Sequence, residues 1–364
     1  MSLDSLEGLE RLSTQLASTS TLDSQWSKNY YLLPYLRNNV PWCCCTSCNP
    51  PIVCVRVAPI RSTIKLAIYM LSQKKKKKKK KKKATASSRP CWLVNLSRCG
   101  VYDEGCEHLE GLVKLKVLNL GFNYITDACL VHLKELINLE CLNLDSCKIG
   151  DEGLAHLKGL LKLRSLELSD TEVGSNGLRH LSGLRNLQSI NLSFTLVTDI
   201  GLKKISGLNS LRSLNLDNRQ ITDNGLAALT CLTGLTHLDL FGARITDAGT
   251  NCLKYFKNLQ SLEVCGGLIT DAGVKNIKDL KALTLLNLSQ NGNLTDKSLE
   301  LISRLTALVS LNVSNSRVSN SGLHHLKPLQ NLRSLSLESC KVTAIEIKKL
   351  QLAALPNLVS VRPE

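Results

Sequence analysis

The first side chains that could support chemistry are the clustered cysteines Cys43, Cys44, Cys45 and Cys48. Cysteine thiolates are common zinc ligands, so such a cluster could contribute to a metal site. A structural zinc site, however, takes paired ligands from two separate places in a chain, and no second pair with suitable spacing accompanies this one. We therefore predict no metal at these cysteines.

Four histidines form a second possible ligand set because they recur every 24 residues. They are His108, His132, His156 and His180. If each lies on a helix that packs beside the next, the helix axes stand about 8 to 10 Å apart. That separation is too large for neighbouring imidazoles to share a zinc ion at about 2 Å. The spacing therefore predicts a solvated row of histidines without a metal.

Nucleophilic catalysis and cofactor binding have no recognisable motif in this chain. Cys99, Cys147 and Cys340 recur at one position of a repeated phrase, where the simpler interpretation is a small side chain packed at a turn. The sequence contains no G-x-S-x-G, no Walker loop, no dinucleotide fingerprint and no H-E-x-x-H. We predict a protein that is not an enzyme, with no catalytic residue and no cofactor.

Acidic side chains and one phenylalanine are the candidate binding residues. They are Asp145, Glu167, Asp217, Asp239, Phe241 and Glu263. Their carboxylates could hold a basic or amide-rich surface of a protein ligand, and the phenylalanine could anchor it. The alternative is that polar residues of this kind only solvate a sheet while phenylalanines cover its edge. The first interpretation requires elements that place residues far apart in the chain side by side.

An internal repeat supplies those elements. A phrase of about 24 residues, L-x-x-L-x-L-x-x-(N/C/T)-x-(I/V)-T-D-x-G-L-x-x-L-x-x-L-x-x, occurs eleven times, and a truncated copy follows at Leu358. The copies, numbered here as repeats 1 to 11, begin at Cys91, Leu115, Leu139, Leu163, Leu187, Leu211, Leu235, Leu259, Leu283, Leu308 and Leu332. So regular a period predicts a solenoid.

The first half of the phrase predicts a strand and a turn. Leucines at positions 1, 4 and 6 face a core. The alternation of apolar and polar residues over positions 4 to 6 indicates a short strand. Position 9 carries small groups able to bond a turning backbone. Examples are Asn123, Cys147, Thr171, Thr195, Asn291 and Cys340.

The second half of the phrase predicts a short helix. Thr-Asp before Gly-Leu is typical of a helix start, with the aspartate as N-cap acceptor. The aspartates are Asp127, Asp151, Asp199, Asp223, Asp247, Asp271 and Asp296, and Ser175 and Asn320 replace them in two copies. Because no single copy can bury its apolar face alone, the copies must stack into one continuous core.

Stacking would bring the candidate binding residues together on one surface. Parallel strands about 4.8 Å apart give roughly 50 Å of curved sheet, whose outward residues at positions 3, 5 and 7 form a concave face. Position 5 is an almost unbroken polar row, and position 7 adds Asp145, Asp217 and Phe241. Phe122 and Phe194 follow at position 8. We predict that a protein partner binds this concave face.

The repeat resembles those of ribonuclease-inhibitor-like and F-box/leucine-rich-repeat proteins, especially intracellular plant members that read I-T-D-x-G-L with Cys or Asn at position 9. The resemblance covers residues 91–364. It implies an α/β leucine-rich-repeat solenoid, with a curved parallel sheet on the concave side and short helices on the convex side. The sequence lacks the L-x-G-x-I-P-x-x-L of plant receptor-kinase ectodomains, which argues against an extracellular receptor.

The resemblance also implies a function. It suggests a substrate-recognition-type subunit related to those of cullin-based (SCF) ubiquitin ligases, in which the repeats hold a target and an F-box docks to an adaptor. No credible F-box precedes Cys91, so the SCF adaptor is an expected partner only if a fuller isoform contains one. The alternative is a stand-alone intracellular scaffold in signalling or defence.

The residues before the repeats divide into two parts. Residues 1–12 resemble the helical half of a repeat, because Leu3, Leu6, Leu9 and Leu12 keep its spacing. Residues 13–90 follow neither period and contain the lysine run 74–83. We interpret them as a spurious insertion, since an adenine tract in retained non-coding sequence reads as lysine. A disordered basic linker and a nuclear-import or anionic-surface patch are the alternatives.

Charge and targeting signals narrow the partners. The chain has a formal net charge of +16, but residues 1–90 hold 17 basic and 4 acidic side chains, which leaves 29 and 26 in the repeats. We therefore expect no nucleic acid on the repeat domain. The start is no signal peptide, and the apolar stretch 51–71 is too charged to span a bilayer. We expect a cytoplasmic protein, with the nucleus as a second compartment, whose fifteen cysteines are thiols.

Overall fold

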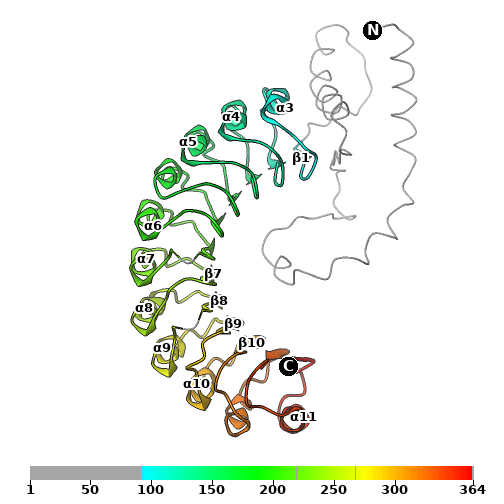
Figure 1. The fold of residues 1–364 in the computed structure, drawn as a ribbon, viewed down its shortest axis with the longest axis vertical. Helices are drawn as coiled ribbons and strands as arrows, with labels where there is room; N and C mark the ends of the chain where they lie inside the picture. The colour runs from blue at the N-terminus through cyan, green and yellow to red at the C-terminus, as the bar shows by residue number, and fades with distance from the viewer. Residues whose placement is uncertain (1–91, 219, 267, 363–364) are drawn as a thin grey trace, which may run out of the picture. The chain divides into compact units, whose positions relative to one another are not determined.

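The computed structural model describes residues 92–362 except Arg219 and Gly267, and the proposals for residues 1–12 and 13–90 lie outside them. The described residues form one sheet of twelve parallel strands in chain order (Figure 1). The strands are β1 Leu93–Asn95, β2 Val117–Asn119, β3 Cys141–Asn143, β4 Ser165–Glu167, β5 Ser189–Asn191, β6 Ser213–Asn215, β7 His237–Asp239, β8 Ser261–Glu263, β9 Leu285–Asn287, β10 Ser310–Asn312, β11 Ser334–Ser336 and β12 Ser360–Arg362. The predicted solenoid with a curved parallel sheet is confirmed.

Short helices follow the strands and cover the convex side of the sheet (Figure 1). The α-helices are α3 Asp103–Cys106, α4 Asp127–Leu130, α5 Asp151–Leu154, α6 Asp199–Ile205, α7 Asp223–Ala228, α8 Asp247–Thr250, α9 Asp271–Ile277, α10 Asp296–Ile302 and α11 Ala344–Ala353. The 3₁₀ helices are η3 Glu107–Leu109, η4 Val131–Leu133, η5 Ala155–Leu157, η6 Gly177–Leu181, η7 Asn251–Tyr255 and η8 Asn320–Leu326. None of the helices within residues 92–362 combines the length and apolar character needed to cross a membrane.

The core is one apolar layer between sheet and helices. It runs without a break from Val94 in β1 to Leu358 before β12, and the leucines of positions 1, 4 and 6 are almost fully buried in it. Burying one such side chain contributes about 2 kcal/mol. Because each leucine packs between those of the repeats before and after it, the stabilisation belongs to the stack rather than to any repeat.

The predicted bonding of position-9 side chains to the turn after the strand is confirmed for Asn123, Cys147, Thr171, Thr195 and Asn291. Buried Asn123 donates through Nδ2 to the carbonyls of Leu96 and Leu120, and its Oδ1 accepts from the backbone N–H groups of Cys99 and Val101. Cys147 donates to the backbone carbonyls of Leu120 and Asp145, and Thr171 donates to that of Leu168. The residue before, at position 8, has a left-handed backbone in most repeats, including non-glycine residues with φ between 50° and 62°.

The prediction that the helix-start aspartates are N-caps is wrong. The N-cap is the residue before, such as Thr126, whose hydroxyl accepts from the N–H of Ala128. The aspartate, first residue of the helix, reaches the neighbouring repeat instead: Asp103 accepts from the backbone N–H and the hydroxyl of Thr126. The bond from the backbone N–H recurs along the stack, where Asp127 accepts from Gly150, Asp151 from Gly174, Asp199 from Thr222, Asp223 from Thr246, Asp247 from Thr270, Asp271 from Thr295 and Asp296 from Ser319.

This aspartate ladder explains the glycine that stands two residues after several of the aspartates, such as Asp223 and Asp247. A Cβ built on Gly225 would overlap Oδ1 of Asp199, and one on Gly249 would overlap Oδ1 of Asp223. Ser175 and Asn320 keep the ladder where aspartate is absent, since they accept from the backbone N–H groups of Thr198 and Thr343. The D-x-G motif therefore marks a close contact between neighbouring repeats.

The expectation that every cysteine is a thiol is wrong for Cys106 and Cys129, which form a disulfide between α3 and α4. Their positions in successive repeats bring the two Cα atoms to 5.4 Å, a normal distance for such a bond. Within the described residues, no cluster of three or more His, Cys, Asp or Glu could hold a metal. His132 of the histidine row instead contacts Glu110, with 2.8 Å between Nδ1 and Oε1.

Candidate functional site

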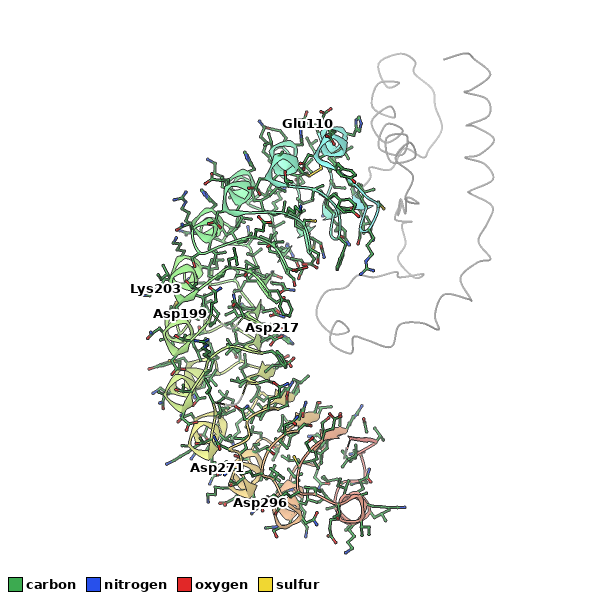
Figure 2. All side chains as sticks on the ribbon, in the orientation of Figure 1. Glu110, Asp199, Lys203, Asp217, Asp271 and Asp296 are labelled. Carbon is green, nitrogen blue, oxygen red and sulfur yellow. A yellow bond between two sulfur atoms is a disulfide. The ribbon has the colours of Figure 1, made fainter. Side chains whose placement is uncertain are left out.

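The candidate residues lie on the concave face, at and just after the strand ends. In most strands the middle residue is buried while the first and third are partly exposed, so positions 3 and 5 face away from the core. Glu167, Asp239 and Glu263 end β4, β7 and β8 at position 5. Figure 2 shows Asp217, at position 7, on the concave side, while Lys203 lies on the convex helices.

The asparagines of position 5 have a structural role in the strand ends. Oδ1 of Asn143 accepts from the backbone N–H of Asp145, and Asn215 and Asn312 bond Asp217 and Ser314 in the same way. Each asparagine thereby stabilises the residues that follow its strand. Several side chains of this polar row are therefore already bonded to the backbone of their own repeat. The carboxylates are the residues of the face that differ from repeat to repeat.

The six predicted residues fall into two groups. The first consists of Asp145 and Glu167 in repeats 3 and 4. Asp145 accepts from Asn143 Nδ2 at 2.9 Å and from the backbone N–H of Ser169 at 3.0 Å. Burial, with a further contribution from the Asp145 charge, raises the pKa of Glu167 to about 7.

The second group consists of Asp217, Asp239, Phe241 and Glu263 in repeats 6 to 8. Asp239 stands opposite Glu263 in the register of β7 and β8. Burial first, and the charges of Asp239 and Asp217 after it, raise the pKa of Glu263 to about 7. Burial also raises the pKa of Asp239, although its carboxylate accepts from the backbone N–H of Phe241.

The two groups are separated by repeat 5, where Asn191 and Ser193 occupy positions 5 and 7. The hydroxyl and backbone N–H of Ser193 both donate to Oδ1 of Asn191. The stretch between the groups is therefore uncharged. The structure does not merge the six residues into one continuous patch.

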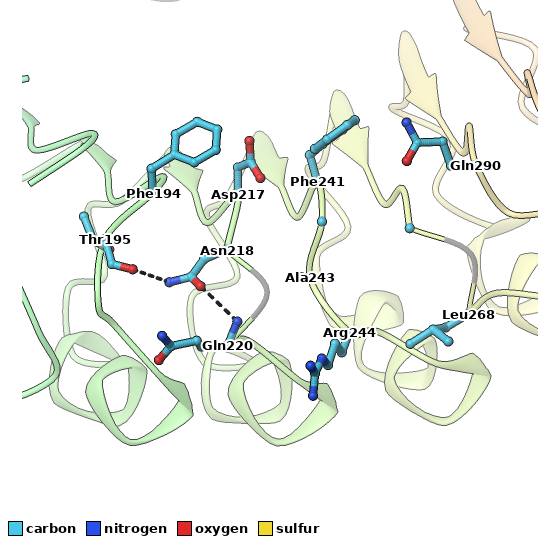
Figure 3. A pocket seen from close by; sticks show the side chains of 12 residues that line it. Phe194, Thr195, Asp217, Asn218, Gln220, Phe241, Ala243, Arg244, Leu268 and Gln290 are labelled. Atoms are coloured by element: carbon cyan, nitrogen blue, oxygen red, sulfur yellow. Dashed lines mark hydrogen bonds between the residues drawn. The ribbon is translucent and has the colours of Figure 1, made fainter. Parts of the chain in front are cut away.

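A groove, which we call the edge groove, lies beside the second group, at the turns that follow β5 to β9 (Figure 3). Its volume is about 890 Å³. Side chains that line it include Phe194, Asp217, Phe241, Arg244, Leu268 and Gln290. Only Asp217 and Phe241 of these belong to the predicted binding residues, so the sequence interpretation missed most of the groove.

A sequence signal for the edge groove exists in the repeats that depart from the phrase. Position 9 is Asn, Cys or Thr in several copies, but repeats 6 to 8 have Arg219, Ala243 and Gly267 there. Asn218, one residue earlier, bonds the carbonyls of Thr195 and Val197 in the preceding repeat instead. The change of residue type at position 9 in three consecutive copies marks the place of the groove.

The other predicted aromatic anchor has a different environment. The guanidinium carbon of Arg98 lies 4.4 Å from the ring centre of Phe122, in repeats 1 and 2. Phe122 does not line the edge groove, whereas Phe194 does. The three phenylalanines named from the sequence therefore do not form one cluster.

Comparisons with known proteins agree with the fold. The sequence matches a family described as Leucine Rich repeat over residues 135–157, 160–182, 183–206, 207–229 and 232–253, and a second described as Leucine rich repeat over 257–318. Among curated proteins, no relative matches significantly.

Solved structures similar to this chain include repeat proteins of several sources. An internalin from Listeria monocytogenes has 25% identity and a TM-score of 0.49, over 71% of this chain and 82% of its own. The structure of a TDR receptor has 19% identity and a TM-score of 0.50, over 74% of this chain and 46% of its own. At such identity the second likeness concerns the fold alone. With its repeats, its twelve-stranded parallel sheet and these family matches, this chain is a leucine-rich-repeat protein.

Proposed function

We propose that residues 92–362 are a non-catalytic scaffold that captures a protein partner with a basic surface on the concave face. The observation that carries the proposal is the cluster of carboxylate side chains in the second group, in repeats 6 to 8. None of the ion pairs found within the described residues uses Asp239 or Glu263. A cationic partner would supply the opposite charge to the half-buried Asp239 and the buried Glu263, which within this part of the chain accept only from neutral amide groups of Asn215 and Asn287 and from the backbone. A charge contact is strongest in such surroundings.

Residues Asp145 and Glu167 extend the same proposal to repeats 3 and 4. The spacing of parallel strands is about 4.8 Å, so the two acidic groups are separated by roughly 10 to 15 Å along the solenoid. A folded partner with two basic patches could contact both groups, while a short peptide would contact one. This proposal assigns Asp145, Glu167, Asp217, Asp239, Phe241 and Glu263 to partner binding.

The test compares partner capture by three forms of the full chain: wild type, Asp239→Asn with Glu263→Gln, and a control with Asp279→Asn and Glu172→Gln. The control removes the same two charges from exposed positions outside the concave face. We expect wild type and control to retain a basic protein from native tissue, in a salt-dependent way, and the concave variant to lose it. An unchanged set of retained proteins, with folding intact by circular dichroism, would refute the proposal.

A more specific proposal concerns protein turnover. The I-T-D-x-G-L spelling of the repeats supports a substrate-recognition role related to SCF ubiquitin ligases, because it resembles the repeats of F-box/leucine-rich-repeat proteins. Affinity purification followed by immunoblotting for the adaptor and the cullin tests it. Recovery of both with wild type supports this role, and recovery of a basic partner without either favours a stand-alone scaffold in signalling or defence. We place either form in the cytoplasm or nucleus.

A further inference from the structure

In repeat 7 the edge groove passes a turn whose residues differ from those of repeat 2. In repeat 2 the position-9 side chain, Asn123, is buried and bonds several backbone groups of the turn. In repeat 7 that position is Ala243, which has no side-chain polar group, and the residue before it is Gly242 with φ of 71°. Gly242 and Ala243 both line the groove, and their small size leaves this part of the groove without bulky side chains.

Three large apolar side chains line the groove among polar ones. Phe194 is 66% exposed and Leu268 is 45% exposed. Phe241 is half-buried. Figure 3 shows Phe194 and Phe241 beside the strands and Leu268 on the opposite side of the groove, toward the helices. Exposed large apolar side chains that line one groove mark a contact surface for a partner.

Phe194 adds an independent observation. Its backbone φ is 55°, in the left-handed region, where a bulky residue is disfavoured by about 1 kcal/mol or more. Glycine occupies the same position in repeats 7 and 8. The left-handed backbone is shared by most repeats at this position, and what distinguishes Phe194 is a large apolar side chain that is 66% exposed there.

Charge differs between the two sides of the groove. Asp217 lines it on the concave side, and Asp239 and Glu263 follow on the adjoining strands. The exposed Arg244 lies at the outer side, toward the helices (Figure 3). A ligand that places an apolar group in the groove would thus have carboxylates next to it in the direction of the concave face.

We propose that the edge groove binds a bulky apolar side chain of an extended peptide segment in the partner, and that a lysine or arginine next to that side chain contacts Asp239 and Glu263. The groove spans repeats 5 to 9, which at about 4.8 Å per strand is roughly 19 Å, the length of about six extended residues. This inference rests on the proposed function, because it names the segment through which the basic partner is held.

The first experiment selects peptides from a displayed library of random sequences on the immobilised full chain. We expect the enriched peptides to combine a bulky apolar residue with a neighbouring lysine or arginine. One enriched peptide and a twin with glycine in place of the apolar residue are then measured by fluorescence anisotropy. The wild type should bind the twin at least about tenfold more weakly, because burying one large side chain is worth that much or more.

The second experiment locates the effect. Phe194→Gly removes a groove wall at a backbone position that suits glycine, so the variant is expected to fold. Phe122→Gly is the matched control, with φ of 60° at the same repeat position but outside the groove. Phe194→Gly should reduce the preference for the apolar peptide over its glycine twin to less than about threefold. Phe122→Gly should keep the full preference of about tenfold. A double-mutant cycle over protein and peptide measures this difference directly.

The outcomes separate this inference from the function on which it rests. Basic peptides that lose binding with Asp239→Asn and Glu263→Gln, but show no preference for the apolar residue, overturn the groove and leave the scaffold intact. Peptide binding that is unchanged by both carboxylate substitutions overturns the proposed function and the proposed role of the groove together. If peptides bind only after the lysine run 74–83 is replaced by serine, this chain's own basic segment is the occupant, and the assignment to a partner is wrong.

Discussion

At the scale of single residues, the fold makes the side chains of Glu263 and Glu167 weaker acids. Burial raises the pKa of each from 4.5 to about 7, and neighbouring carboxylates add to the effect. Both groups therefore hold a proton in the folded protein under conditions in which the unfolded chain has lost it. A cationic partner would reverse this, because its charge favours the ionised carboxylate.

The first prediction concerns stability and pH. Because the folded pKa of Glu263 lies above its unfolded value, the folded state binds more protons between about pH 4.5 and 7, and stability is lost as pH rises through that window. Glu263→Gln should remove this loss, so that the variant is about 1 to 3 kcal/mol more stable than wild type at pH 8 and nearly equal to it below pH 4.5.

Urea unfolding followed by circular dichroism at a series of pH values measures the effect. Glu172→Gln is the control, because Glu172 is exposed on a loop, and its pH profile should follow that of wild type. A Glu263→Gln profile parallel to the wild-type profile would contradict the assigned burial effect.

Turn residues show how a single position can be structural in one repeat and variable in another. Asn291 donates from Nδ2 to the carbonyls of Val264 and Leu288 and accepts from the N–H of Ile269, and it is 1% exposed. Repeats 6 to 8 lack a comparable side chain at this position. The difference distinguishes repeats 6 to 8, in the middle of the edge groove, from repeat 9 at its end.

The second prediction follows from that bonding. Asn291→Ala should destabilise the protein by about 2 to 4 kcal/mol, since it leaves buried carbonyl and N–H groups without partners. Asn209→Ala provides a control at an exposed position and should change the unfolding midpoint little. Comparable midpoints for the two variants in urea would show that the turn does not need its asparagine.

At the scale of elements, the aspartate ladder links each helix start to the next repeat. Asp223 accepts from both the backbone N–H and the hydroxyl of Thr246, at 2.8 and 2.6 Å. The threonine in turn caps its own helix by accepting from the N–H of Ala248. One short motif thus begins a helix and fixes its position against its neighbour, so helix formation depends on the stacking of repeats.

The third prediction concerns the glycine of this motif. Gly225→Ala should destabilise the protein by about 1 to 3 kcal/mol, because the added methyl group would meet the Asp199 carboxylate. Gly207→Ala is the control, since nothing lies within 4 Å of a Cβ at that position, and it should be neutral or slightly stabilising. Thermal and urea unfolding compare the two, and equal losses would argue against the close approach.

At the scale of the whole molecule, a solenoid repeat contacts mainly its neighbours, so stability is a sum of local terms that can differ along the chain. The disulfide between Cys106 and Cys129 joins repeats 1 and 2. Cys99 and Cys147, also buried in the first three repeats, are free thiols. The covalent link therefore acts only at the beginning of the described stack.

The fourth prediction is that loss of this disulfide loosens only the first repeats. Replacing Cys106 and Cys129 by alanine should remove up to about 3 kcal/mol of loop-closure stabilisation. Hydrogen exchange should then become faster in residues 92–140 and stay unchanged in repeats 6 to 8. Cys231→Ala, which removes an exposed free thiol, is the control. Uniformly faster exchange along the stack would contradict this local effect.

Much of the fold could be predicted from the period alone. The leucines at positions 1, 4 and 6 identify the buried face, and a period of 24 residues identifies the stack, because stacking is the only way for short copies to bury that face. The concave position of Asp239 and Glu263 follows from strand alternation. These features depend on local pattern and on solvent, which every copy of the phrase shares.

The tertiary structure decided which groups meet across repeats. That Asp127 bonds Gly150, that Cys106 bonds Cys129, and that Phe194, Phe241 and Leu268 share one groove all depend on the register of neighbouring turns. The raised pKa of Glu263 depends on how far packing removes it from water. A repeat pattern specifies which face a side chain occupies, but contact and desolvation depend on distances between copies, and those distances are set only when the whole stack packs.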